Sequence, residues 1–216
     1  MVYHLVRKRG IPVLASSRSD PAAPWPCTLF ARYSETHLQA SLYLRFSVPV
    51  CGFSQDQTFT LIYDADNLVP GVNSIKPVTK SPPQDQLVEL ARSGNAQLRV
   101  LALTIKQPCP IHCPLSAGNL GPKSGFDVPF HQLQKIAQAT EIDVLLDYNW
   151  LHTDNRAFFD KLIKHPEELA GLTEDDKYTT HHRRANWTIF SPVDQEEPPP
   201  YAPASHKRSR QSEFPT

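Results

Sequence analysis

Residues 98–114 read Leu-Arg-Val-Leu-Ala-Leu-Thr-Ile-Lys-Gln-Pro-Cys-Pro-Ile-His-Cys-Pro, and this stretch decides the fold that the sequence predicts. Its first half is a nearly continuous apolar run, which is the pattern of a short β-strand buried on both faces. Three prolines end that run, because proline cannot donate a hydrogen bond to a sheet ladder. The stretch therefore predicts a buried strand from Leu98, followed by a proline-rich break that contains Cys109, His112 and Cys113.

Strand patterns also precede this stretch. Residues 28–33 form a short apolar run, and residues 41–50 alternate apolar and other side chains with the period of two that a half-buried strand requires. Residues 57–63 show the same alternation, and the segment 52–56 between the two is typical of a hairpin turn. These segments predict an antiparallel region in the first half of the chain.

Helices alternate with strands in the second half of the chain. Apolar spacing predicts helices at 84–92, 130–139 and 154–165, and further strands at 142–146 and 187–190. Asp154 is the expected cap of the third helix. The strand from Leu98, the second helix and the strand that follows it fit a right-handed crossover with parallel strands.

These elements together predict an α+β (mixed α/β) fold, in which an antiparallel strand region leads into helix–strand units. We expect a flexible N-terminal segment at 1–26, one globular domain at 27–191 and a disordered, proline-rich and basic tail at 192–216. The first nineteen residues contain arginines and serines but no acid, a composition shared by transit peptides, so such a role for the N-terminus stays open.

The overall composition narrows the classes of function. Lys plus Arg and Asp plus Glu number 22 each, so the formal net charge is zero and no overall field favours nucleic acid or an acidic substrate. No stretch approaches the ~20 apolar residues of a membrane-spanning helix, so we expect no membrane span. The expected location is the nucleus or the cytoplasm.

The cysteines raise the question of a metal site. Four cysteines are too few and too scattered for a disulfide scaffold, so we expect reduced thiols. Cys109, His112 and Cys113 are metal-ligand types within five residues, and Cys27 or Cys51 could complete a four-ligand zinc site. The spacing argues against zinc, because a zinc knuckle usually has two residues between its cysteines and this segment has three. Buried or idle thiols are the favoured interpretation, and no cofactor is expected.

Patterns for catalysis or nucleic-acid binding are weak. No Gly-x-Ser-x-Gly elbow is present, and the loop at 118–125 has Pro122 where a phosphate-binding loop needs a glycine with a backbone N–H. Asp147 closes an apolar strand, a common place for a catalytic acid in α/β sheets, although a residue that only begins a loop is commoner. Arg183 and Arg184 could contact nucleic acid, but no aromatic residues are interleaved with them, and a solvated basic loop is the simpler interpretation.

The most specific motif lies in the tail. Pro198, Pro199 and Tyr201 form Pro-Pro-x-Tyr, which WW domains bind as a polyproline II ligand with the tyrosine in an adjacent pocket. A basic cluster follows at Lys207, Arg208 and Arg210, and it predicts binding by a nuclear import receptor or contact with an anion.

The segment 185–194, Ala-Asn-Trp-Thr-Ile-Phe-Ser-Pro-Val-Asp, is followed by Glu-Glu-Pro-Pro-Pro-Tyr and by Lys-Arg-Ser-Arg. This combination resembles the C-terminal segment of a group of uncharacterised proteins from filamentous fungi. The resemblance extends back through residues 130–151. It implies a fungal origin, and it carries no functional residues over because the group has no established activity.

The sequence therefore favours a non-enzymatic intracellular interaction protein whose tail carries a WW-domain ligand and a basic cluster. One alternative is a metal-dependent or hydrolytic enzyme that uses Cys109, His112, Cys113 and Asp147. Another is a nucleic-acid-associated protein that uses Arg183 and Arg184. Nucleic acid is the less favoured partner, because the chain carries no net positive charge.

Overall fold

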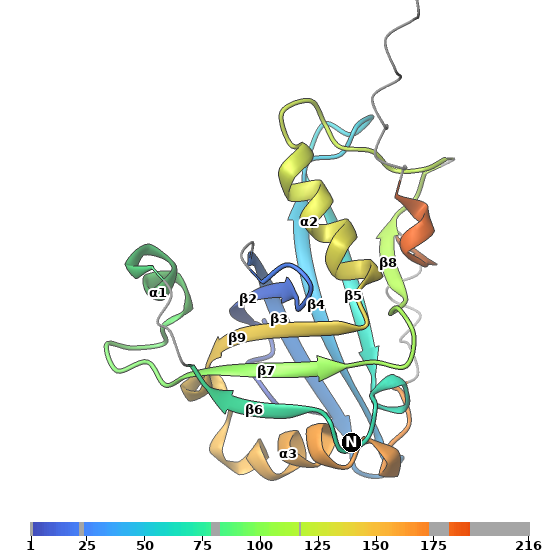
Figure 1. The fold of residues 1–216 in the computed structure, drawn as a ribbon. Coiled ribbons are helices and arrows are strands. Elements are labelled where there is room, and N and C mark those ends of the chain that lie inside the picture. Colours follow the sequence, from blue (N-terminus) through green and yellow to red (C-terminus); the bar gives the residue numbers. More distant parts are fainter. Residues whose placement is uncertain (1, 22–23, 79–82, 117, 173–181, 191–216) are drawn as a thin grey trace, which may run out of the picture.

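The computed structural model describes residues 2–21, 24–78, 83–116, 118–172 and 182–190. This part of the chain forms a ten-stranded sheet with three α-helices (Figure 1). The strands are β1 (Val2–His4), β2 (Ile11–Ser17), β3 (Trp25–Ser34), β4 (Gln39–Val48), β5 (Gln57–Asp64), β6 (Ser74–Pro77), β7 (Leu98–Thr104), β8 (Ile111–Pro114), β9 (Glu141–Asp147) and β10 (His182–Ala185). The helices are α1 (Gln84–Leu90), α2 (Asp127–Gln138) and α3 (Arg156–Lys164).

The strand order is β10-β8-β5-β4-β3-β2-β9-β7-β6, with β1 paired to β3 beyond the end of β2, and every strand pair is antiparallel. Figure 1 shows β6, β7 and β9 running across the direction of β3, β4 and β5, so the sheet is strongly coiled. The predicted α+β class with an antiparallel strand region is confirmed, and the strands predominate.

The predicted hairpin forms the centre of the sheet. β4 and β5 pair so that Leu44 lies opposite Leu61 and Phe46 lies opposite Phe59, and all four side chains are buried. The period-two pattern of the sequence therefore selects this register, because a slip of one residue would turn these side chains away from the core.

Two helices complete the core. Phe130, Leu133 and Ile136 form the buried face of α2, which packs against β2, β3 and β4 (Figure 1). The α3 helix buries Phe159, Leu162 and Ile163. The predicted helices at 130–139 and 154–165 are thus present, but α3 begins later than predicted, and its cap position is Asn155 rather than Asp154.

The predicted parallel crossover is wrong. β7 and β9 are antiparallel neighbours, with Leu101 opposite Val144. The chain does not return directly from β7 through α2 to β9, because it first forms β8 beside β5 on the other side of the sheet. β9 therefore enters from the opposite end.

Two short segments also differ from the prediction. The proline-rich break contains β8, which pairs with β5 and β10, and Pro114 lies only at its last position. The expected strand at 187–190 is a 3-10 turn at Trp187–Ile189, because the Asn186 side chain accepts a hydrogen bond from the backbone N–H of Thr188 and caps it. The last described strand is β10, which contains the arginines expected in a loop.

The N-terminal segment belongs to the sheet, contrary to the expectation of a flexible segment at 1–26. β2 lies between β3 and β9, and Ile11, Val13 and Ala15 are buried. The sequence did not reveal this strand, because its buried residues run consecutively from Val13 to Ser17 and do not alternate, and Pro12 lies within it opposite Thr28. The tail at 192–216 lies outside the described residues. Within the described part, no helix has the length and apolar character needed to cross a membrane.

Candidate functional site

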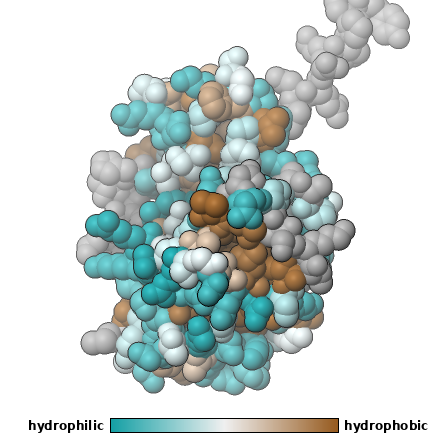
Figure 2. Space-filling model, turned by 90° about the vertical axis from the view of Figure 1, so that its left-hand side faces the viewer, coloured by the Kyte–Doolittle hydropathy of each residue, from teal (hydrophilic) through white to brown (hydrophobic). Residues whose placement is uncertain are grey.

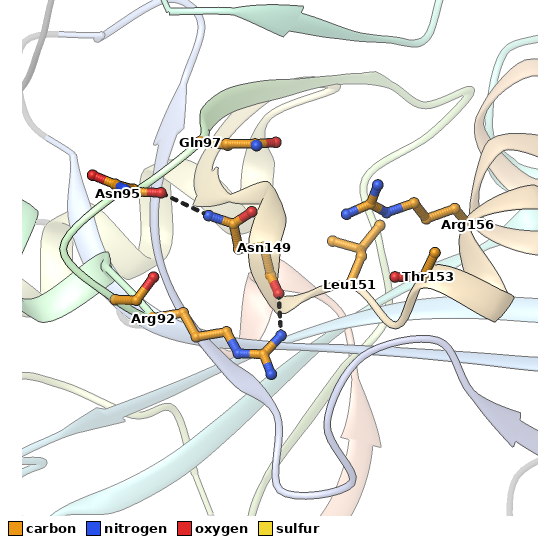
Figure 3. A pocket seen from close by; sticks show the side chains of 8 residues that line it. Arg92, Asn95, Gln97, Asn149, Leu151, Thr153 and Arg156 are labelled. Atoms are coloured by element: carbon orange, nitrogen blue, oxygen red, sulfur yellow. Dashed lines mark hydrogen bonds between the residues drawn. The ribbon is translucent and has the colours of Figure 1, made fainter.

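A polar hollow of about 550 Å³ opens at the end of the sheet where β9 stops and β7 begins. Its walls come from the loop after α1, the segment after β9 and the start of α3 (Figure 3). The lining consists of Arg92, Ser93, Asn95, Gln97, Asn149, Leu151, Thr153 and Arg156. Only one of these side chains is apolar, so the hollow is suited to a hydrogen-bonding ligand.

The floor of the hollow is organised by Asp147, the last residue of β9, whose side chain is fully buried. Its carboxylate accepts hydrogen bonds from the backbone N–H groups of Arg92 (2.9 Å), Gln97 (2.9 Å) and Asn149 (3.0 Å). A buried carboxylate needs such donors to offset its desolvation. Asp147 thus ties the loop after α1 to the end of β9, and its oxygens are turned away from solvent.

Trp150 fixes the other side of the same loop. Its indole Nε1 donates a hydrogen bond of 2.8 Å to the carbonyl of Leu90, the last residue of α1. The Arg7 guanidinium lies 4.3 Å from the centre of the indole ring, and the Arg92 guanidinium lies 6.0 Å from it. These cation–π contacts bring two arginines from distant parts of the chain to one aromatic ring.

The hydrogen bonds of the hollow are largely side chain to backbone. The Arg92 guanidinium donates to the carbonyl of Asn149 at 2.5 Å, and the Asn149 amide donates to the carbonyl of Asn95 at 2.9 Å (Figure 3). Arg156, the first residue of α3, places its guanidinium 4.7 Å from the centre of the Tyr148 ring. Its Nε is buried and has no hydrogen-bond partner in the described chain.

The face that carries α1 also has an apolar region. Figure 2 shows hydrophobic side chains near the centre of this face, with hydrophilic side chains around them. Val88 of α1, a helix at the edge of the view in Figure 1, is 71% exposed. The helix prediction at 84–92 is confirmed, but its apolar stripe is only partly buried.

The structure separates the residues of the proposed metal site. Cys109 precedes β8, while His112 and Cys113 are consecutive in that strand, so their side chains point to opposite faces. Among the described residues, the only close group of three metal-ligand side chains is the exposed set His165, Glu167 and Glu168. Cys109, His112 and Cys113 therefore do not converge on one point.

The thiols of this region belong to the core. Cys109 and Cys113 are fully buried, and the Cys113 thiol lies 3.6 Å from the carbonyl of Arg183 as a weak donor. Burial raises the pKa of Cys109 to about 12, although the neighbouring Tyr63 hydroxyl opposes that rise. Burial also raises the pKa of Cys113. Both groups are held as neutral thiols at neutral pH, whereas metal ligation and nucleophilic attack need the thiolate.

Asp147 is also remote from these cysteines, because β5, β4, β3 and β2 separate β8 from β9 in the sheet.

Of the two candidate nucleic-acid contacts, the Arg183 guanidinium donates to the Ser116 hydroxyl and to the carbonyl of Gly118, both at 3.3 Å. Arg184 is exposed on the same strand. Pro198, Pro199, Tyr201, Lys207, Arg208 and Arg210 lie outside the described residues.

Sequence reasoning missed the two arginines of the hollow. Arg92 follows α1 and Arg156 begins α3, so each lies at the end of an element, 64 positions apart, and no motif joins them. The one available signal is the aromatic pair Tyr148 and Trp150, which follow a buried strand and offer ring faces to cations. Comparisons with protein-family models, curated proteins and solved structures give no match.

Proposed function

We propose that the protein is a non-enzymatic interaction protein of the nucleus or cytoplasm, which recruits a WW-domain partner through Pro198, Pro199 and Tyr201. The observation that carries the proposal is the Pro-Pro-x-Tyr motif itself. Proline holds the backbone in the extended polyproline II form before binding, so little conformational entropy is lost on docking.

The described part of the chain supports this proposal indirectly. Asp147, the leading catalytic candidate, is fully buried and engaged by three backbone amides. Cys109 and Cys113 are buried neutral thiols. A substrate in solvent could reach none of these groups without local unfolding, so the enzyme alternative has little support. The nucleic-acid alternative rests on Arg183 and Arg184, of which the first is hydrogen-bonded to Ser116 and Gly118.

The test is calorimetric titration of the full chain with an isolated WW domain that prefers Pro-Pro-x-Tyr ligands. We expect saturable one-to-one binding that Tyr201→Ala abolishes, because the tyrosine ring fills the second pocket of the motif. The matched control is Pro203→Ala, a change in the same tail outside the motif, which should leave the affinity within about twofold. Unchanged binding by Tyr201→Ala would remove the WW-ligand role.

The basic cluster at Lys207, Arg208 and Arg210 supports a second part of the same proposal, entry into the nucleus through an import receptor. Residues 192–216 fused to a fluorescent protein too large to diffuse through nuclear pores should accumulate in the nucleus. Replacing the three basic residues by alanine should return the fusion to the cytoplasm. Equal distribution of both fusions would contradict the import role.

A further inference from the structure

We propose that the hollow lined by Arg92 and Arg156 binds a small hydroxylated molecule through a phosphate monoester, with both guanidinium groups on the phosphate. This ligand site is independent of the WW-domain proposal, because it uses no residue of the tail. The charge of the hollow, the placement of Arg156 at the start of α3 and the polar lining all favour such a ligand.

The two arginines have no carboxylate partner in the described chain. The ion pairs of this part of the protein involve Arg18, Lys135, Lys161, Lys164 and His165, and none of them joins Arg92 or Arg156. The Asp147 carboxylate is hydrogen-bonded to three backbone amides of this region, and one carboxylate offsets at most one of the two guanidinium charges. Asp154, the nearest acid along the chain to Arg156, is exposed and forms no ion pair with it. The hollow therefore presents excess positive charge.

Arg156 occupies a position that is unfavourable for the helix it begins. The N-terminal end of a helix carries partial positive charge, which favours acidic residues there and opposes basic ones. The first turn of α3 has no acidic residue, and the acid of the 3-10 turn Thr153–Asn155 that leads into it, Asp154, is exposed. The last turn of α3 has Lys161 and Lys164, which do fit the dipole. A bound anion would offset the cost of the Arg156 charge at this end of the helix.

The geometry also leaves donors for a ligand. Arg92 uses one terminal nitrogen on the Asn149 carbonyl, and the Trp150 ring restrains the rest of its guanidinium. Arg156 stacks on Tyr148, its Nε is buried, and its terminal nitrogens donate no hydrogen bond within the described chain, so they remain for a ligand. Figure 3 shows Arg156 extending from α3 toward the middle of the view and Arg92 entering from the opposite loop. Two preoriented forks of this kind suit the bidentate geometry of a phosphate.

The other lining residues favour a hydroxylated ligand body. Ser93 and Thr153 offer hydroxyl groups, and Asn95, Asn149 and Gln97 offer side-chain amides. Leu151 is the single apolar lining residue, so an apolar ligand would cover the polar lining groups without offering them hydrogen bonds. The volume of about 550 Å³ lies within the range for small-molecule sites, which favours a sugar phosphate over a phosphorylated protein segment.

The chain offers a local readout, because it has three tryptophans and one of them, Trp150, contacts Arg92. We would titrate the ¹⁵N-labelled full chain with glucose 6-phosphate and follow the three indole N–H resonances. The expected result is a saturable shift of the Trp150 resonance, with Trp25 and Trp187 unchanged. Unphosphorylated glucose should give no shift, and inorganic phosphate should give a weaker saturable one.

Three variants test the roles of the arginines. Arg156→Gln and Arg92→Gln should each weaken glucose 6-phosphate binding by about tenfold or more, because each removes a charge-assisted fork. Arg156→Lys should recover part of that loss, since it restores charge but not the fork. The charge-matched control is Lys164→Gln at the other end of α3, which should change the affinity by less than about twofold. The remaining amide resonances report whether each variant is folded.

Several outcomes would overturn the proposal. A shift that grows linearly without saturation, or an equal loss with Lys164→Gln, would mean non-specific attraction to a basic surface. Tighter binding of a phosphoserine peptide than of glucose 6-phosphate would assign the hollow to a protein partner instead. A Trp150 resonance that never moves would remove the site altogether.

Discussion

The carboxylate of Asp147 accepts a 2.9 Å hydrogen bond from the backbone N–H of Arg92, a residue 55 positions earlier in the chain. The carboxylate accepts two more hydrogen bonds, from the backbone N–H groups of Gln97 and Asn149. A single buried acid thereby holds both walls of the arginine hollow in place. The strand-end carboxylate that the sequence marked as a possible catalyst organises the backbone under a binding surface.

Asp147→Asn should destabilise the protein by about 2–4 kcal/mol, because the amide nitrogen would face a backbone donor and leave it buried without an acceptor. The measurement is the free energy of unfolding from urea denaturation. The matched control is Asp143→Asn in the same strand, whose carboxylate is partly exposed and lies 3.4 Å from Arg18. That control should cost about 1 kcal/mol or less. Equal costs for the two variants would contradict the organising role of Asp147.

Gly10 and Gly52 form a second matched pair. Both have positive φ, +81° and +84°, but a Cβ on Gly10 would clash with the Thr28 side chain and come within 2.9 Å of Phe30, whereas Gly52 has nothing within 4 Å. Gly52→Ala should cost about 1 kcal/mol from backbone strain alone. Gly10→Ala should cost about 2–4 kcal/mol, because overpacking is added to that strain. Thermal or urea unfolding of the two variants checks the difference, and a smaller cost at Gly10 would mean that β3 yields easily.

The periodic spacing of apolar residues predicted the strands and helices that bury one side against the core. The β4–β5 hairpin, α2 and β9 were predictable because residues such as Phe46, Phe59 and Leu133 repeat with the period of their element. The antiparallel pairing of β7 with β9 was not predictable, because its direction depends on the pairing of β8 with β5, which is a contact between distant parts of the chain. β2 was missed because its buried residues do not alternate and a proline lies within it, although the strand lies inside the sheet.

The candidate site was less predictable than the fold. Asp147 stood out in the sequence because it closes an apolar run, but its partners are backbone amides, which no side-chain pattern reveals. Arg92 and Arg156 are brought together by the antiparallel return of the chain and by the start of α3. A basic residue at the end of an element is common, so neither arginine could be distinguished before its neighbours were known.

The cysteines predict a selective labelling pattern. Cys51 is exposed, whereas Cys27, Cys109 and Cys113 are buried. A thiol-reactive disulfide reagent such as DTNB attacks only the thiolate, and burial raises the pKa of all three buried thiols. At pH of about 8 the native protein should react rapidly at one thiol and the denatured protein at four. Cys51→Ser should remove the rapid phase, and rapid reaction of more than one native thiol would contradict the burial of the others.

The same buried thiols predict a loss of stability in alkali. Burial raises the pKa of Cys27 and Cys109 above their ordinary value of 9.0, so the folded state keeps protons that the unfolded state releases. The contribution of these thiols to the free energy of unfolding is therefore fully present below about pH 8. It is lost as the pH rises above about 9, by about 1.4 kcal/mol per pH unit for each thiol. Urea denaturation at a series of pH values measures this slope. Cys109→Ala should make the slope between pH 9 and 10 shallower without abolishing it, because Cys27 and Cys113 still contribute. Cys51→Ser, a change at an exposed thiol, should leave the slope unchanged. A free energy of unfolding that stays constant up to about pH 11 would show that the buried thiols lose their protons as easily in the folded state as in the unfolded one.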